Sequence, residues 1–88
     1  MKVDGYWLIE TSGATQLLET IHSRDRRSLV VISEVDGFGY RVKSFALEKD
    51  EFGLEPIWME IDSPSIIDDL AIAKRIATEL MSAVNGSI

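Results

Sequence analysis

The chain has 88 residues, a net charge of −6 and no cysteine, and 45% of its residues are hydrophobic. That length suits a single domain, residues 1–88, and the composition excludes a disordered chain, disulfides and thiolate metal sites. The first apolar run stops at Glu10, too early for a signal peptide, and no run reaches the roughly 18 residues of a membrane span. We therefore expect a cytoplasmic protein with no membrane partner and no cofactor.

A strand and a helix are expected in the first part of the chain. The aromatic-rich run Tyr6-Trp7-Leu8-Ile9 predicts a strand over 3–10. Apolar residues then recur at i, i+3, i+4 and i+7, the spacing of one helical face: Ala14, Leu17, Leu18 and Ile21. This spacing predicts a helix over 13–23. The basic residues Arg24, Arg26 and Arg27 would form its solvated end, or alternatively contact a phosphate or an acidic partner.

Three strands separated by glycine-containing turns are expected next. The β-branched run around Val30 predicts a strand over 28–35, and further strands are expected over 39–48 and 55–62. The alternation of the second strand is imperfect, because Tyr40 and Val42 share one face while Phe45 and Leu47 share the other. A β-bulge near Ser44 would place all four side chains on one side.

The last element is expected to be a helix over 65–84. Ser63 followed by Pro64, or Ser65 followed by Asp68, would start it. Apolar residues then recur every three or four positions: Ile66, Leu70, Ala73, Ala77, Leu80 and Val84. Ile67 and Ile76 widen this stripe, and Leu70 and Ile76 are expected in the core.

The expected order is β-α-β-β-β-α, which indicates an α+β two-layer sandwich. A three-stranded antiparallel meander, with an additional N-terminal strand, would carry both helices on one face and leave the other face open. From residue 12 onward this order is similar to that of a double-stranded RNA-binding domain. Those domains begin the final helix with lysines, whereas the segment 65–69 is acidic here, so RNA binding is not expected.

Catalytic residues are scarce. His22 is the only histidine, and no nucleophile, phosphate-loop or zinc-site motif is present. Asp50, Glu51 and Glu55 would gather at a hairpin tip, where carboxylates either hold a hard cation or remain solvated. We expect a protein that is not an enzyme, with a small carboxylate- or metal-dependent enzyme as the alternative.

The expected binding surface is the open face of the sheet. If Ile57, Met59 and Ile61 face the helices, strand alternation places three side chains on that open face: Trp58, Glu60 and Asp62. An exposed tryptophan is typical of a binding hot spot. Phe38 and Phe52 lie in the expected turns, where each would either fold back onto the core or anchor a partner.

Charge points to the kind of partner. Residues 48–69 contain eight acidic residues and one basic residue, a net charge of −7 that exceeds that of the whole chain. Such a segment opposes direct binding to nucleic acids, which depends on lysine and arginine. We expect a protein-binding module, in one form a phage-type or mobile-element-type inhibitor or accessory factor that docks on the basic groove of a nucleic-acid enzyme. The alternative is a homo-oligomer that buries the open face against its own copy.

Overall fold

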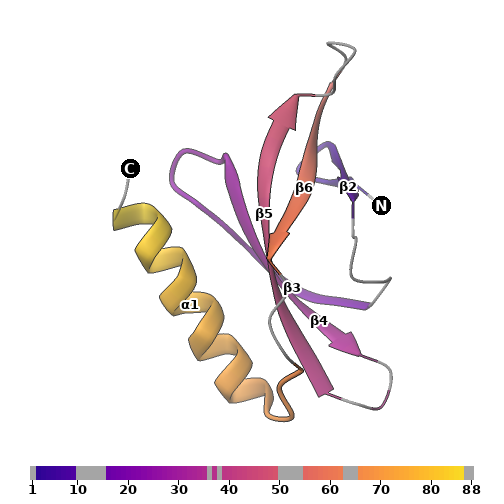
Figure 1. Cartoon of the computed structure of the whole chain (residues 1–88), viewed down its shortest axis with the longest axis vertical. Helices are drawn as coiled ribbons and strands as arrows, with labels where there is room; N and C mark the ends of the chain where they lie inside the picture. Colours follow the sequence, from indigo (N-terminus) through magenta and orange to yellow (C-terminus); the bar gives the residue numbers. More distant parts are fainter. Residues whose placement is uncertain are drawn as a thin grey trace.

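The described part of the chain is a curled sheet of six strands with one helix (Figure 1). This computed structural model describes residues 2–9, 16–35, 37, 39–49, 55–62 and 66–86. The elements are β1 (Lys2–Val3), β2 (Tyr6–Ile9), β3 (Gln16–His22), β4 (Ser28–Val35), β5 (Gly39–Lys49), β6 (Pro56–Asp62) and α1 (Leu70–Gly86). The sheet order is β1-β2-β6-β5-β4-β3, and only the β2–β6 pair is parallel. The expected three-stranded meander with two helices on one face is therefore wrong.

The expected first strand is a hairpin instead. Asp4 and Gly5 form its turn, with φ angles of 55° and 87°. Positive φ at both central residues is the geometry of a type I′ turn, for which Asp-Gly is a favoured pair. The turn folds β1 back on β2, so that Lys2 pairs with Trp7.

The expected helix over 13–23 is wrong, because the described residues 16–22 form the edge strand β3. The pairing of β3 with β4 shifts between Leu17 and Glu19, which leaves Leu18 as the extra residue of a β-bulge. The bulge reverses the alternation, so Leu17 and Ile21 join the cores on opposite faces of the sheet. The apolar spacing that predicts one helical face is therefore divided here between the two faces of a strand, each of which packs against a core. Because this segment is a strand, the chain does not have the helix-strand-strand-strand-helix order of double-stranded RNA-binding domains.

The strands expected over 28–35, 39–48 and 55–62 are confirmed as β4, β5 and β6. A bulge that gathers all the apolar residues of β5 on one face is not found, because β4 and β5 pair in continuous register from Ser28 to Val35. The observed shift at Ser44 and Phe45 lies in the β5–β6 pairing. β5 instead needs apolar residues on both faces, because both faces of this sheet pack against a core.

One core lies on each face of the sheet. On the outer face, α1 packs against β3, β4 and β5. The buried residues of this core are Val30, Ile32, Val42, Ala73, Ala77 and Met81. On the inner face, the sheet curls over a second core that consists of Leu8, Leu29, Val31, Phe45 and Trp58. Because β4 alternates between these cores, its central residues are buried on both sides.

The C-terminal helix is confirmed with a later start than expected. Asp69 caps it, since its carboxylate accepts a hydrogen bond from the N–H of Ala71 at 2.8 Å. From Leu70 onward the apolar stripe packs against the outer core as expected, with Leu70 and Ile76 half-buried. Ile66, expected in the same stripe, lies before the helix and is 43% exposed. Before the helix, Ile67 forms two backbone hydrogen bonds with Tyr40 at the start of β5. Gly39 allows this approach, because a Cβ there would lie 2.5 Å from the Ile67 carbonyl oxygen.

Candidate binding surface

Trp58 is buried rather than exposed. Its side chain has no solvent-accessible surface, and its indole N–H donates a hydrogen bond to the Val3 carbonyl at 2.9 Å. The prediction of an open face around Trp58 is therefore wrong. It assumed that only one face of the sheet is covered, whereas the curl covers the inner face with the β1–β2 hairpin. In this conformation Trp58 offers no surface to a partner.

The remaining expected site residues do not form one surface among the described residues. Glu60 is half-buried and pairs with Phe45, a residue of the inner core. Glu55 is exposed just before β6. Asp62 ends β6, and its side chain lies outside the described part of the structure. Four other expected site residues also lie outside the described residues: Asp50, Glu51, Phe38 and Phe52.

A different surface lies on the outer face of the sheet, over β2 and β6, because α1 packs against β3, β4 and β5. The parallel register aligns Leu8 with Trp58 and Ile9 with Met59. Since neighbouring residues alternate between faces, Leu8 and Trp58 point into the inner core while Trp7 and Ile9 point outward. The outward side chains form what we call the outer patch: Trp7, Ile9, Ile57 and Met59.

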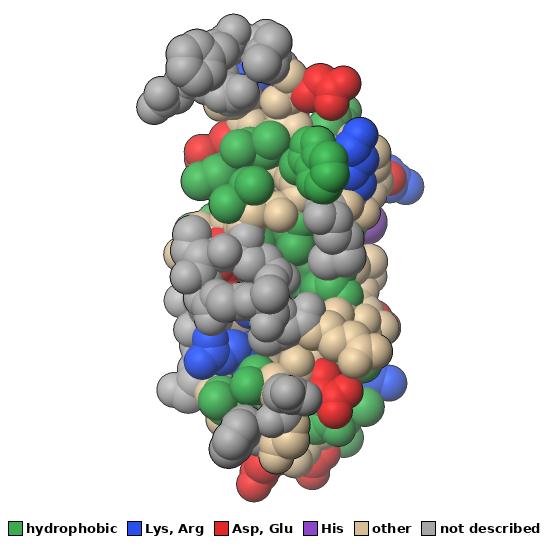
Figure 2. Space-filling view, turned by 90° about the vertical axis from the view of Figure 1, so that its right-hand side faces the viewer, with side chains coloured by type: hydrophobic (Ala, Val, Ile, Leu, Met, Phe, Trp, Pro, Cys, Tyr) green, Lys and Arg blue, Asp and Glu red, His purple; other side chains and the backbone are tan. Residues whose placement is uncertain are grey.

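The outer patch is substantially open to solvent. Trp7 is 50% exposed and Ile9 is 41% exposed, while Ile57 and Met59 are half-buried. Ile61, farther along β6, is 66% exposed. Figure 2 shows hydrophobic side chains at the surface on this side of the molecule, close to basic and acidic ones. A cluster of exposed apolar side chains, unlike an isolated one, is typical of an interaction site.

Charged residues stand at the two ends of one row through the outer patch. Lys2 on β1 pairs with Trp7, and its ammonium nitrogen lies 5.3 Å from the centre of the Trp7 ring. Register places Trp7 beside Ile57, and Ile57 pairs with Glu48 on β5. The row therefore crosses four strands with a cation at one end and an anion at the other. Both charged residues are exposed.

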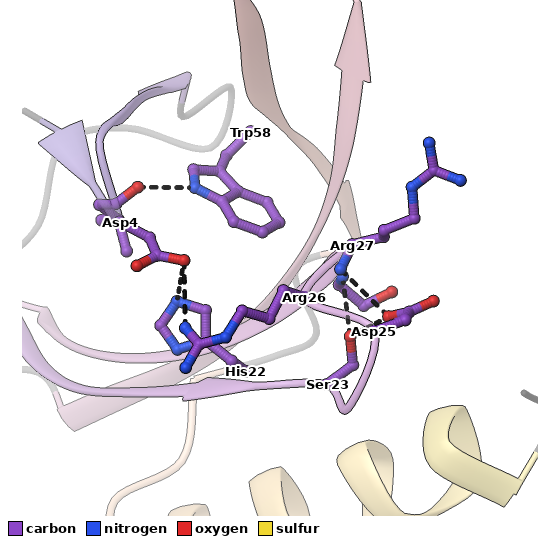
Figure 3. A network of polar contacts seen from close by, with 9 residues as sticks. Asp4, His22, Ser23, Asp25, Arg26, Arg27 and Trp58 are labelled. Carbon is purple, nitrogen blue, oxygen red and sulfur yellow. Dashed lines mark hydrogen bonds and ion pairs between the residues drawn. The ribbon is translucent and has the colours of Figure 1, made fainter.

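A polar network connects the turn of the β1–β2 hairpin to β3 and to the β3–β4 loop (Figure 3). The Asp4 carboxylate lies 3.3 Å from a guanidinium nitrogen of Arg26 and 3.7 Å from Nε2 of His22. His22 also packs edge-on against Trp58, with ring centres 6.2 Å apart. These contacts join the β1–β2 turn to the β3–β4 loop. The only histidine of the sequence therefore lies against the buried tryptophan.

Hydrogen bonds among its own residues hold the β3–β4 loop. The Ser23 hydroxyl donates to the Asp25 carboxylate at 2.6 Å, and the Arg27 N–H donates to the same oxygen at 3.1 Å. These two hydrogen bonds, the serine first, hold the pKa of Asp25 below its ordinary value. The expected helix-end cluster of arginines is thus part of a hairpin loop, in which Arg26 contacts Asp4.

Two other features are weaker candidates for a site. A shallow groove of about 430 Å³ lies between β3 and the end of α1, and Ile21, Arg24, Met81 and Asn85 are among its lining residues. Lys43 is fully buried on the inner face of the sheet, where it pairs with Val31 of the inner core and is therefore not at the surface. Within the described ranges, no group of three or more metal-ligating side chains is assembled.

Comparison with known proteins adds no family to this picture. No protein-family model matches the chain, and neither the curated proteins nor the solved structures contain a match. Among the described residues, no helix is both long and apolar enough to cross a membrane. The sequence did contain a signal for the outer patch, since Trp7 and Ile9 alternate with Leu8, but it did not show which side of the strand would be covered.

Proposed function

We propose that the chain is a small, non-catalytic protein-binding module that docks through the outer patch. The observation that carries this proposal is the half-exposed Trp7 at the centre of an apolar sheet face that α1 does not cover. Tryptophan is enriched among the residues that dominate binding free energies, because its large ring buries much surface with few rotatable bonds. Four neighbouring apolar side chains on regular strands also form a rigid surface, so little conformational entropy is lost on binding.

The partner in this proposal is a protein and not a nucleic acid. The net charge of −6 opposes a phosphate backbone, and Lys2 is the lysine that the described residues place beside Trp7 of the outer patch. We also propose that the module acts in the cytoplasm, because small secreted domains generally depend on disulfides and this chain has no cysteine. A catalytic role is not part of the proposal, since the sequence has one histidine and no cysteine, and within the described ranges no group of three or more metal-ligating side chains is assembled.

Photo-cross-linking tests the proposal directly. A photoreactive phenylalanine analogue is placed at position 7, and the matched control carries it at position 72, because Ile72 is an apolar residue of α1 with 41% exposure. Both variants are expressed in the native host and irradiated. Position 7 is expected to give one discrete adduct, with another protein or with a second copy of the chain, and position 72 is expected to give none. Equal adducts at both positions, or none at position 7, would refute docking through the outer patch.

A second candidate is the acidic inhibitor of a nucleic-acid enzyme. The supporting observation is that Glu48, Glu55, Asp68 and Asp69 are all exposed within the segment that carries the excess negative charge. Complementary charge accelerates association, and added salt screens it over about 8–10 Å. Binding to such an enzyme should therefore slow steeply as salt is raised, and a Glu48→Lys/Glu55→Lys variant should associate more slowly. An association rate that is insensitive to both changes would refute this form of the function.

A further inference from the structure

The charged row across the outer patch points to a specific partner. Resting on the proposed function, we infer that the outer patch binds a second copy of this chain, in a two-fold dimer that places Lys2 of each copy opposite Glu48 of the other.

The row has opposite chemistry at its two ends and apolar chemistry between them. Lys2, Trp7, Ile57 and Glu48 occupy consecutive strands β1, β2, β6 and β5. With strands about 4.8 Å apart, the two charged residues are separated by about 14 Å, and the apolar pair lies midway between them. The centre of the row therefore falls between β2 and β6.

A two-fold axis through that centre makes the row complementary to itself. If the axis lies in the interface and runs along the strands, it reverses the order of the strands in the second copy. Trp7 then faces Ile57 of the second copy, and Lys2 faces Glu48 of the second copy. An axis perpendicular to the strands would instead place Lys2 against Lys2 and Glu48 against Glu48. Opposite charges therefore select the first arrangement, an isologous contact that closes as a dimer.

The sheet edges are poor alternatives for self-association. β1 contains two residues, and β3 carries a β-bulge at Leu18 and an exposed charge at Glu19. Short, bulged and charged edge strands are typical devices that prevent pairing between sheets. An antiparallel pair of β3 strands centred on Glu19 would also bring two carboxylates together. Self-association is thus directed to the outer patch and away from the edges.

The salt dependence of binding distinguishes a second copy of the chain from a basic partner protein. Each copy has a net charge of −6, so the long-range interaction between two copies is repulsive and salt reduces it. Added salt should therefore leave dimerisation unchanged or strengthen it, whereas it would weaken binding to a basic enzyme. The contacts between Lys2 and Glu48 are exposed and contribute little affinity, so they specify the arrangement more than they drive it.

The test is the oligomeric state of the purified chain by sedimentation, from about 1 μM to about 1 mM. A monomer–dimer equilibrium is expected, and Trp7→Ala should weaken it at least about tenfold, as a hot-spot residue does. Lys2→Glu or Glu48→Lys alone should weaken it by roughly 2- to 30-fold, because each single change replaces two opposite-charge contacts with two like-charge contacts. The double variant Lys2→Glu/Glu48→Lys should restore dimerisation, since it recreates both contacts in reverse. Lys74→Glu, on the exposed side of α1, is the control and should have no effect.

The outcomes separate this inference from the proposed function. A wild-type chain that remains monomeric at 1 mM overturns the inference, as does a dimer that is insensitive to Trp7→Ala or is not restored by the double charge exchange. In each of these cases, a discrete adduct between position 7 and a different protein still supports the proposed function. Circular dichroism and thermal melting confirm that each variant folds, and the charge variants change only exposed residues.

Discussion

Replacing Trp58 by Phe should destabilise the protein strongly, because Trp58 connects the β1–β2 hairpin to the inner core. The substitution removes the hydrogen bond from the indole N–H to the Val3 carbonyl, which contributes about 1 kcal/mol. The smaller ring also leaves a gap in a site with no solvent exposure, which adds about 1–2 kcal/mol. The total of about 2–3 kcal/mol is a large part of the roughly 5–10 kcal/mol expected for such a domain.

Thermal and chemical unfolding measure this effect, and Trp7→Phe is the matched control. In a domain of this size, 1 kcal/mol shifts the melting temperature by about 4–8 °C, so Trp58→Phe should lower it by about 10–20 °C. Trp7→Phe makes the same chemical change at a half-exposed site and should alter stability by only about 0.5 kcal/mol. In that control variant the remaining Trp58 should emit at short wavelength and resist quenching by acrylamide.

Two results would refute the reasoning. Equal melting temperatures for the two variants would mean that Trp58 does not hold the hairpin against the inner core. Ready quenching of Trp58 in the Trp7→Phe protein, under conditions where the protein is folded, would mean that the inner face is open to solvent.

Three further substitutions, one of them with a matched control, test the turns and loops. Gly39→Ala should cost at least about 2 kcal/mol in thermal unfolding, because its Cβ would collide with the Ile67 carbonyl, whereas Gly37→Ala meets no atom within 4 Å and should cost about 1 kcal/mol. Folding lowers the pKa of Asp25 below its ordinary value of 3.8, so the ionised carboxylate stabilises the folded protein above that pH. This stabilisation is lost as the pH falls through the lowered pKa. Unfolding of Asp25→Asn should therefore depend less on pH below about 4 than unfolding of the wild type; identical pH profiles would exclude the carboxylate's role. Asp4→Asn keeps a side chain that tolerates the turn but removes the ion pair with Arg26, so it should cost about 0.2–1 kcal/mol at low salt and nothing at high salt; a cost that persists at high salt would contradict an electrostatic origin.

Local patterns in the sequence were sufficient to predict α1, β4, β5 and β6 among the described elements. The recurrence of apolar residues every three or four positions predicts α1, because the helical period is set by backbone geometry. The β-branched run around Val30 and the glycine-containing turns likewise predict β4, β5 and β6. These signals act over a few residues, so they do not depend on where the rest of the chain lies.

Local patterns misled where a backbone irregularity changes the period. Leu17 and Ile21 have the spacing of one helical face, but in the strand the bulge at Leu18 places them on opposite faces, where each packs against a different core. At the other end, Asp4 and Gly5 carry a hairpin signal that divides one expected strand into two. In both places the competing structure becomes stable only through pairing with a neighbouring strand, which the segment itself does not reveal.

The assignment of the binding surface depended on the tertiary structure. Alternation along β6 places Trp58 on one face and Ile57 and Met59 on the other, and this division is correct in the structure. Which of the two faces is covered is decided by the parallel pairing of β2 with β6, between residues about fifty positions apart in the sequence. That pairing brings the β1–β2 hairpin over Trp58 and leaves Trp7 outside. A period of two residues divides side chains between two faces, but only the curl of the sheet decides which face is closed to solvent.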